Sequence, residues 1–182
     1  MGRRDDVVEA AIRVTAAAGV RGLTHRAVDE EGGLPRGTAS NHFRNKHALT
    51  VGALEHLSER MTEIIGHVDE IPIHDIDDVA AVLGTNVAMS LHSRVLSAAT
   101  AAFFNEANAD PTLHDTVVAT NRMWWQAIAR MLRDAGLTED VDLRAQCLLS
   151  YGNGLVVDQL ALRDPEFDAI AAMRLGVRGF CS

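Results

Sequence analysis

"GTASNHF", residues 37–43, is a polar run closed by one aromatic residue, with "LPR" before it and "RNKHAL" after it. A polar run of this length is ordinarily a loop, yet both flanks have the features of helices. Upstream, Thr24 is a typical N-cap and Gly32-Gly33 is a typical break. Pro35 can stand in the first turn of a helix, because its missing N–H costs nothing there. We therefore predict a short helix from Thr24, a glycine turn, and a second short helix from Pro35 to His42, which together form a helix-turn-helix.

The second short helix, here called the reading helix, has side chains that suit recognition of base edges in a DNA major groove. Arg36 can bond guanine, Asn41 can bond adenine, and the methyl group of Thr38 can meet that of thymine. Gly37 lets the backbone approach the groove, and the polar residues on both flanks suit contacts with phosphates. The predicted DNA-binding residues are Thr24, His25, Arg26, Arg36, Gly37, Thr38, Ser40, Asn41, His42 and Lys46.

The charge distribution bears on an alternative, in which residues 24–47 are an ordinary surface hairpin of helices that binds no DNA. Residues 1–49 hold eight Lys or Arg and six acids, a net charge of +2. Residues 50–182 hold nine Lys or Arg and nineteen acids, a net charge of −10, which accounts for the −8 of the whole chain. A basic head joined to an acidic body is what a protein that touches DNA at one end only would show.

The composition favours an all-α protein. The chain has 182 residues, with four prolines and 4% aromatic residues, and its apolar content lies mostly in Ala, Val, Leu, Ile and Met. Apolar spacing and turn residues predict about nine helices. Besides the two short ones, their expected ranges are 5–18, 45–68, 76–92, 93–108, 111–135, 140–164 and 165–180. The helix 45–68 is too long for the head alone, so we expect it to connect head and body.

Several classes of function lack support in the sequence. No apolar stretch approaches the roughly 20 residues that span a bilayer, and "MGRRDDVVEA" has acids where a signal peptide needs an apolar core. We therefore expect a soluble, cytoplasmic protein with no membrane partner, and Cys147 and Cys181 as reduced thiols. The eight histidines lack metal-site spacing and no nucleophile motif is present, so no metal, cofactor or catalytic residue is expected. The rival interpretation is a helical small-molecule-binding protein or enzyme without a DNA function.

Residues 19–49, "GVRGLTHRAVDEEGGLPRGTASNHFRNKHAL", resemble the DNA-binding head of TetR-family transcriptional regulators. The shared features follow in one order: a Gly-x-x-x-Leu/Thr-Thr stretch, a Gly-Val/Leu turn, a short helix ending near an aromatic residue, and x-x-Lys-x-x-Leu. The resemblance implies a helix-turn-helix DNA-binding domain, residues 1–49, and a ligand-binding and dimerisation domain, residues 50–182. It also implies a homodimer that represses transcription from a palindromic operator in double-stranded DNA until an unknown small-molecule effector binds the body.

Three positions depart from the family pattern. Asp29 stands where a small alanine is usual, Pro35 where Ser or Thr usually caps the reading helix, and Ser40 where tyrosine is usual. We expect Asp29 near the core of the head, paired with an arginine or reaching solvent at the edge. The missing phenol often contacts phosphate in the family, so its role shifts toward His42 and Lys46.

The helix 140–164 contains Gly152 and Gly154, each of which costs roughly 1 kcal/mol against Ala inside a helix. Close approach of another helix would compensate for this cost. The family resemblance implies a four-helix dimer interface here, shared with the last helix. Sequence alone allows an intrachain core helix nearly as well, but the resemblance favours a homodimer through the last two helices.

The aromatic residues of the body are candidates for a ligand pocket, because pockets combine apolar walls with a few polar groups. Trp124 and Trp125 cannot both face the same side of a helix, so we expect one in a core and the other in a pocket or interface. Core packing is the alternative for every residue of this set. An amphipathic apolar ligand is the expected effector. The candidate ligand-binding residues are Met89, His92, Phe103, Phe104, Asn121, Trp124, Trp125 and Tyr151.

Overall fold

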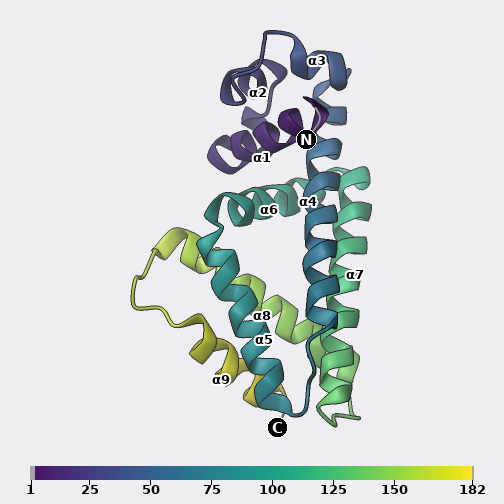
Figure 1. Cartoon of the computed structure of the whole chain (residues 1–182), viewed down its shortest axis with the longest axis vertical. Coiled ribbons are helices and arrows are strands. Elements are labelled where there is room, and N and C mark those ends of the chain that lie inside the picture. The colour runs from purple at the N-terminus through teal and green to yellow at the C-terminus, as the bar shows by residue number, and fades with distance from the viewer. Residues whose placement is uncertain (1–2, 182) are drawn as a thin grey trace. The chain divides into compact units, whose positions relative to one another are not determined.

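A computed structural model describes residues 3–181, and Figure 1 shows its ribbon. The described residues form nine α-helices and no strand, which confirms the predicted all-α class. The helices are α1 (Arg3–Gly22), α2 (His25–Glu31), α3 (Thr38–His42), α4 (Lys46–Asp69), α5 (Ile76–His92), α6 (Arg94–Ala107), α7 (Pro111–Asp134), α8 (Val141–Leu162) and α9 (Ala169–Cys181). None of these helices is by itself long and apolar enough to cross a bilayer, and α5 and α6 meet the criteria of length and composition only as a pair.

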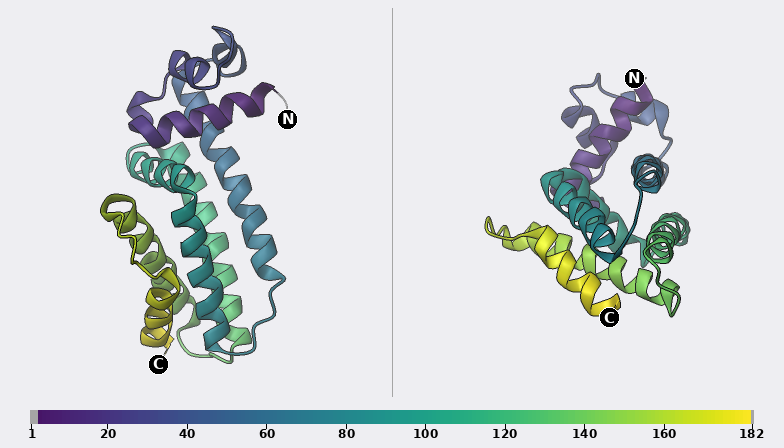
Figure 2. Two further views of the ribbon diagram at one scale, coloured as in Figure 1. Left: turned by 60° about the vertical axis from the view of Figure 1, so that its left-hand side comes forward. Right: turned by 60° about the horizontal axis from the view of Figure 1, so that its bottom comes forward.

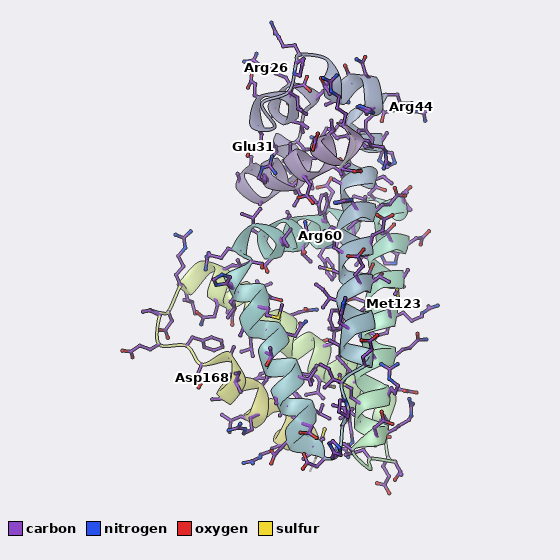
Figure 3. The ribbon with its side chains drawn as sticks, in the orientation of Figure 1. Arg26, Glu31, Arg44, Arg60, Met123 and Asp168 are labelled. Atoms are coloured by element: carbon purple, nitrogen blue, oxygen red, sulfur yellow. The ribbon has the colours of Figure 1, made fainter. Side chains whose placement is uncertain are left out.

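The predicted helix ends agree with the structure where a local signal is strong. The range predicted for α5 is correct at both ends, and Asp75 caps this helix by accepting the N–H groups of Asp77 and Asp78. The first helix was predicted to end at residue 18, and Gly19, the next residue, interrupts α1 with a φ of 64°. By contrast, α9 begins four residues later than predicted, because Asp168 (labelled in Figure 3) caps its first turn.

Packing divides the described chain into two compact units. Unit 1 contains the described residues up to Met61 together with Val95–Ala119. Unit 2 contains Thr62–Arg94 together with the described residues from Thr120 onward. Helices α4 and α7 therefore each contribute residues to both units. The functional domains 1–49 and 50–182 stay a prediction, since the units describe packing and not function.

The core of unit 1 joins the N-terminal helices to α6 and to the start of α7. Val8 and Ile12 of α1 are fully buried, as is Leu49 of α4. Phe103 of α6 and Leu113 of α7 belong to the same buried cluster. The apolar face of α1 is thus covered in part by residues about ninety positions later in the chain, and Figure 2 shows α6 beside α1.

Unit 2 is built around α5, which packs against both α8 and α9 (Figure 2). A Cβ atom on Gly84 would come within 2.8 Å of the Cα atom of Ile170, so α5 and α9 approach closely because Gly84 has no side chain. Gly152 of α8 also faces this core, near Val87 and Met173. A Cβ atom on Gly154 would meet nothing within 4 Å. Packing within the chain therefore explains why position 152 of α8 is a glycine, but it does not explain the glycine at position 154.

The two glycines of α4 provide a test of the unit 1 core. A Cβ atom on Gly52 would overlap the buried Phe43 ring, whereas one on Gly66 would meet nothing within 4 Å. Overpacking costs about 1–3 kcal/mol, which exceeds the helix propensity of about 1 kcal/mol that alanine gains over glycine. Gly52→Ala should therefore lower the free energy of unfolding in urea, and Gly66→Ala should raise it. Equal effects of the two substitutions would contradict the packing of Phe43 against α4.

Candidate functional site

The helix-turn-helix begins at α2, which Thr24 caps as predicted. The Oγ1 atom of Thr24 accepts the N–H of Ala27 at 3.1 Å. One residue later, the Nε2–H of His25 donates to the carbonyl oxygen of Phe43 at 2.7 Å. This bond ties the start of α2 to the residue that ends α3.

The reading helix, α3, begins at Thr38, three residues later than predicted. Pro35 lies in the turn before it, where its carbonyl oxygen accepts the N–H of Thr38 at 3.1 Å and the hydroxyl at 2.6 Å. Gly37 stands between the turn and the helix with a φ of 90°, a left-handed conformation that favours glycine. The prediction of Pro35 in the first helical turn was wrong because this left-handed residue interrupts the helix after it.

Asp29 caps α3 from the neighbouring helix. It is only 5% exposed, and its Oδ2 and Oδ1 atoms accept the N–H groups of Gly37 at 2.7 Å and Ala39 at 2.8 Å. The expectation of an arginine partner or of contact with solvent was wrong. The N–H groups at the start of a helix need acceptors and carry partial positive charge, which favours a carboxylate. Asp29 thus supplies the cap that Ser or Thr provides in the family pattern.

The residues of α3 and of the turn before it divide between a buried and an exposed side. Ala39 is fully buried in the core of unit 1, and Thr38 is buried beside it with its hydroxyl bonded to Pro35. Arg36, Gly37 and Ser40 line an open recess of ≈ 600 Å³, together with residues of α2. The exposed polar residues of this segment are Arg36, Ser40, Asn41 and His42. Polar side chains are therefore presented to solvent along one edge of the helix-turn-helix.

Positively charged side chains are exposed near this edge of the helix-turn-helix. Arg26 pairs with Glu30 at 2.8 Å, and this hydrogen bond raises the pKa of the guanidinium. Lys46 donates to the carbonyl oxygen of Arg21 at 3.0 Å and forms no ion pair with a carboxylate among the described side chains. Figure 3 shows the side chains of Arg26 and Arg44 projecting away from the ribbon. Within residues 3–49, the exposed arginines that form no ion pair with another described residue are Arg3, Arg4, Arg21, Arg36 and Arg44.

Unit 2 contains an apolar groove between the C-terminal part of α4 and α5. Its volume of ≈ 440 Å³ lies in the range of small-molecule sites. Three residues that line it, Ile64, Ile71 and Met89, are among the large apolar side chains that remain exposed. The described residues that line the groove include no lysine or arginine.

The polar side chains of the groove are mostly hydrogen-bond acceptors. The Nδ1–H of His67 donates to the carbonyl oxygen of Glu63 at 2.7 Å, which leaves Nε2 of the neutral ring as an acceptor. The hydroxyl of Thr85 donates to the carbonyl oxygen of Ala81 at 2.8 Å, which leaves its oxygen lone pairs. Asn86 lines the groove as well, and its amide can both donate and accept.

The predicted ligand-binding residues do not come together in one place. Phe103 is 0% exposed in the core of unit 1, and Phe104 packs against the same core. Met89 lines the groove of unit 2. Trp124 lines a separate small cavity of ≈ 40 Å³ between α5, α7 and α8, which Asn86 also borders. The set as predicted therefore spans two units.

The remaining predicted residues lie outside both spaces of unit 2. His92, Asn121 and Trp125 are not among the residues that line the groove or the small cavity. Tyr151 contacts α9: its hydroxyl donates to the carbonyl oxygen of Ala172 at 3.3 Å, and its ring meets that of Phe180 edge-on, with centroids 6.0 Å apart. Of the two adjacent tryptophans, only Trp124 borders one of these spaces.

Comparison with known proteins decides the family. Residues 74–180 match the sequence model described as the Tetracyclin repressor-like, C-terminal domain. The chain belongs to the TetR family of transcriptional regulators. Members of the TetR family are transcription factors and not enzymes, in agreement with the sequence prediction. No curated protein matches the chain by sequence.

Solved structures of regulators share the fold of this TetR-family protein. A transcriptional regulator from Rhodococcus sp. Rha1 is similar with a TM-score of 0.82 and 23% identity, over 97% of this chain and 95% of that one. The regulator FadR from Bacillus subtilis, in complex with stearoyl-CoA, has a TM-score of 0.76 and 16% identity, over 98% and 97%. A regulator from Saccharomonospora viridis, in complex with choline, has a TM-score of 0.76 and 21% identity, over 97% and 94%.

The sequence prediction for this TetR-family chain did not include most of the residues that line the groove. Ile64 and Val68 are four residues apart on α4, and Val82 and Met89 are seven apart on α5. This spacing places each pair on one face of its helix. Buried core residues have the same spacing. The sequence could therefore have indicated these faces of α4 and α5, but not that they remain exposed to solvent.

The groove should bind a neutral apolar dye such as Nile red, and Met89→Asp should weaken that binding. Met89 is 59% exposed at the groove, and a charged side chain in an apolar wall costs on the order of 1 kcal/mol, equivalent to a loss of affinity of about fivefold. Val95→Asp is the control, since Val95 is 47% exposed on α6 and does not line the groove. Fluorescence titration measures both, and equal losses would place the dye elsewhere.

Proposed function

We propose that this TetR-family protein is a sequence-specific DNA-binding regulator, a ligand-responsive repressor that acts as a homodimer on a palindromic operator. The observation that carries the proposal is the exposed polar edge of α3, with arginines beside it that form no ion pair with another described residue. DNA phosphates would supply the missing negative partners.

The proposed contacts with DNA divide into two classes. Arg36, Ser40 and Asn41 are exposed on the reading helix and its turn and would meet base edges. Lys46 and Arg44 follow the reading helix and would meet phosphates. Thr24, His25 and Thr38 also belong to the predicted set, but each already makes a hydrogen bond within the head. For these three residues, positioning of the helix-turn-helix is a sufficient role.

The exposed apolar surface of α8 and α9 supports the homodimer. Of the ten large apolar side chains that remain exposed in the described chain, six lie on these two helices. Such a concentration is typical of a surface that a partner covers. The open space around Gly154 would also admit close approach of a second helix. The six residues are Leu143, Val157, Leu162, Ile170, Leu175 and Phe180.

The groove between α4 and α5 is the proposed effector site. It lacks cationic side chains, and its polar groups are mainly acceptors, which favours a neutral or cationic apolar ligand with an N–H or O–H donor. Structures of similar regulators are complexes with compounds of very different charge, stearoyl-CoA in one and choline in another. Because α4 is one continuous helix from Lys46 to Asp69, a ligand at its C-terminal part would act on the helix that begins beside α3. Affinities for ligand and DNA would then be reciprocally coupled.

Selection of bound sequences from a random duplex pool, at fixed near-physiological salt, tests the proposal. The expected result is an enriched palindrome with half-sites about one helical turn apart, since a two-fold dimer places two reading helices in successive major grooves. Titration of the enriched duplex against a scrambled duplex then gives the ratio of specific to non-specific affinity. If no sequence is enriched and binding disappears at moderate salt, the protein is a helical ligand-binding protein without a DNA function.

Two substitutions should separate base contacts from phosphate contacts. Lys46→Ala should weaken binding to all duplexes alike and lower the slope of log affinity against log salt by about one. Arg36→Ala should instead relax the preference at one base pair by about 1–3 kcal/mol. Arg133→Ala is the control for net charge, because Arg133 pairs with Asp142 in unit 2. An unchanged preference in Arg36→Ala would remove Arg36 from base recognition.

A further inference from the structure

The turn between α2 and α3 is fastened at both ends by one residue, Asp29. At the start of the turn, its backbone carbonyl oxygen accepts the N–H of Leu34 at 2.8 Å. At the end of the turn, its two carboxylate oxygens accept the N–H groups of Gly37 and Ala39. Two of the three oxygen atoms of Asp29 therefore bind the six-residue turn 32–37, and the third binds Ala39 in the first turn of the reading helix.

The reading helix has little else to hold its first turn. It is five residues long, and a helix of this length is not stable by itself. Gly37 has no side chain to cap it, and no other described side chain accepts an N–H group at this end. Ala39 is fully buried, so without Asp29 its N–H would be both buried and unsatisfied.

The position of Asp29 is unusual for a surface proposed to bind DNA. A carboxylate close to phosphates opposes binding, and Asp29 borders the same open recess as Arg36 and Ser40. Its burial and its two short bonds give it a different role, because they fix the backbone that carries these exposed side chains. Side chains that recognise bases must be held within a fraction of an ångström, and their supports must therefore be rigid.

We propose that Asp29 is the positioning residue of DNA recognition in this protein. It touches no base, but its contact with the start of α3 sets where Arg36, Ser40 and Asn41 meet the major groove. Sequence preference then depends on Asp29 more strongly than overall DNA affinity does. The inference rests on the proposed DNA-binding function and adds the residue by which the helix-turn-helix holds its reading edge.

The test is Asp29→Asn in the full-length protein. Asparagine keeps the size of the side chain but has one acceptor and one NH₂ group, so one N–H of the reading helix would face another donor. The ratio of affinity for the selected duplex to affinity for a scrambled duplex should fall by about tenfold, the usual scale for loss of a helix cap. A purely stabilising role would reduce the folded fraction and lower both affinities alike, leaving this ratio unchanged. An unchanged ratio in folded protein would overturn the proposal.

Glu30→Gln is the matched control. Glu30 is the next residue of α2, is exposed, and bonds Arg26 and not α3. This substitution removes the same charge from the same helix, so it should raise both affinities slightly and leave their ratio unchanged. If Glu30→Gln lowers the ratio as much as Asp29→Asn does, the effect is one of charge and the positioning role is excluded.

Amide hydrogen exchange without DNA distinguishes failure of this inference from failure of the proposed function. In the wild-type protein the N–H groups of Gly37 and Ala39 should be protected, and in Asp29→Asn or Asp29→Ser at least one should exchange about tenfold faster. Protection that does not change would overturn the capping contact itself. If protection changes as expected but the wild-type protein prefers no duplex, Asp29 caps the helix and both the DNA function and the positioning role fail.

Discussion

The four N-terminal helices meet at Phe43. Its backbone N–H donates to Ala39 of α3 at 2.9 Å, and its carbonyl oxygen accepts the ring N–H of His25 at the start of α2. Its buried ring lies against Gly52 of α4, and the guanidinium of Arg4 of α1 lies 5.2 Å from the ring centroid. The short α3 could not hold a position by itself, so its place is set by helices that do have cores. The aromatic residue that closes "GTASNHF" is thus the anchor of the polar run before it.

Features that depend on neighbours in sequence were predictable. Thr24 and Gly19 act on residues within one helical turn, and α5 follows from the periodic apolar residues between Asp75 and Ser93. The family resemblance was also local, since it depended on residues 19–49, and the match over residues 74–180 then decided the family independently. Local chemistry and a short motif were therefore sufficient for the helices and the fold class.

Features that depend on residues far apart in sequence were not predictable. Asp29 was expected beside an arginine, because the sequence shows its charge but not that two N–H groups from a later turn point at it. Phe103 was grouped with Trp124 on composition, whereas the structure places Phe103 in a core with α1 and Trp124 beside α5 and α8. Pro35 was wrongly assigned to the first turn of the reading helix for a related reason. The sequence does not show that the backbone of Gly37 adopts a left-handed conformation. In each instance the missing information was which surfaces face each other.

The core of unit 1 has a consequence for how regulators of this kind diversify. A segment ending at Met61 contains the whole helix-turn-helix but lacks Phe103 and Leu113, and the apolar faces of α1 and α4 would then be open to water. Recombination at a single point after α4 would combine the head of one regulator with the α6 of another. The residues of that α6 would then not match the apolar face of α1. New DNA specificities are therefore more easily reached by point changes at exposed residues of α3 than by exchange of heads. Variation in α6 should likewise follow variation in α1, although the four helices α2–α5 separate them along the chain.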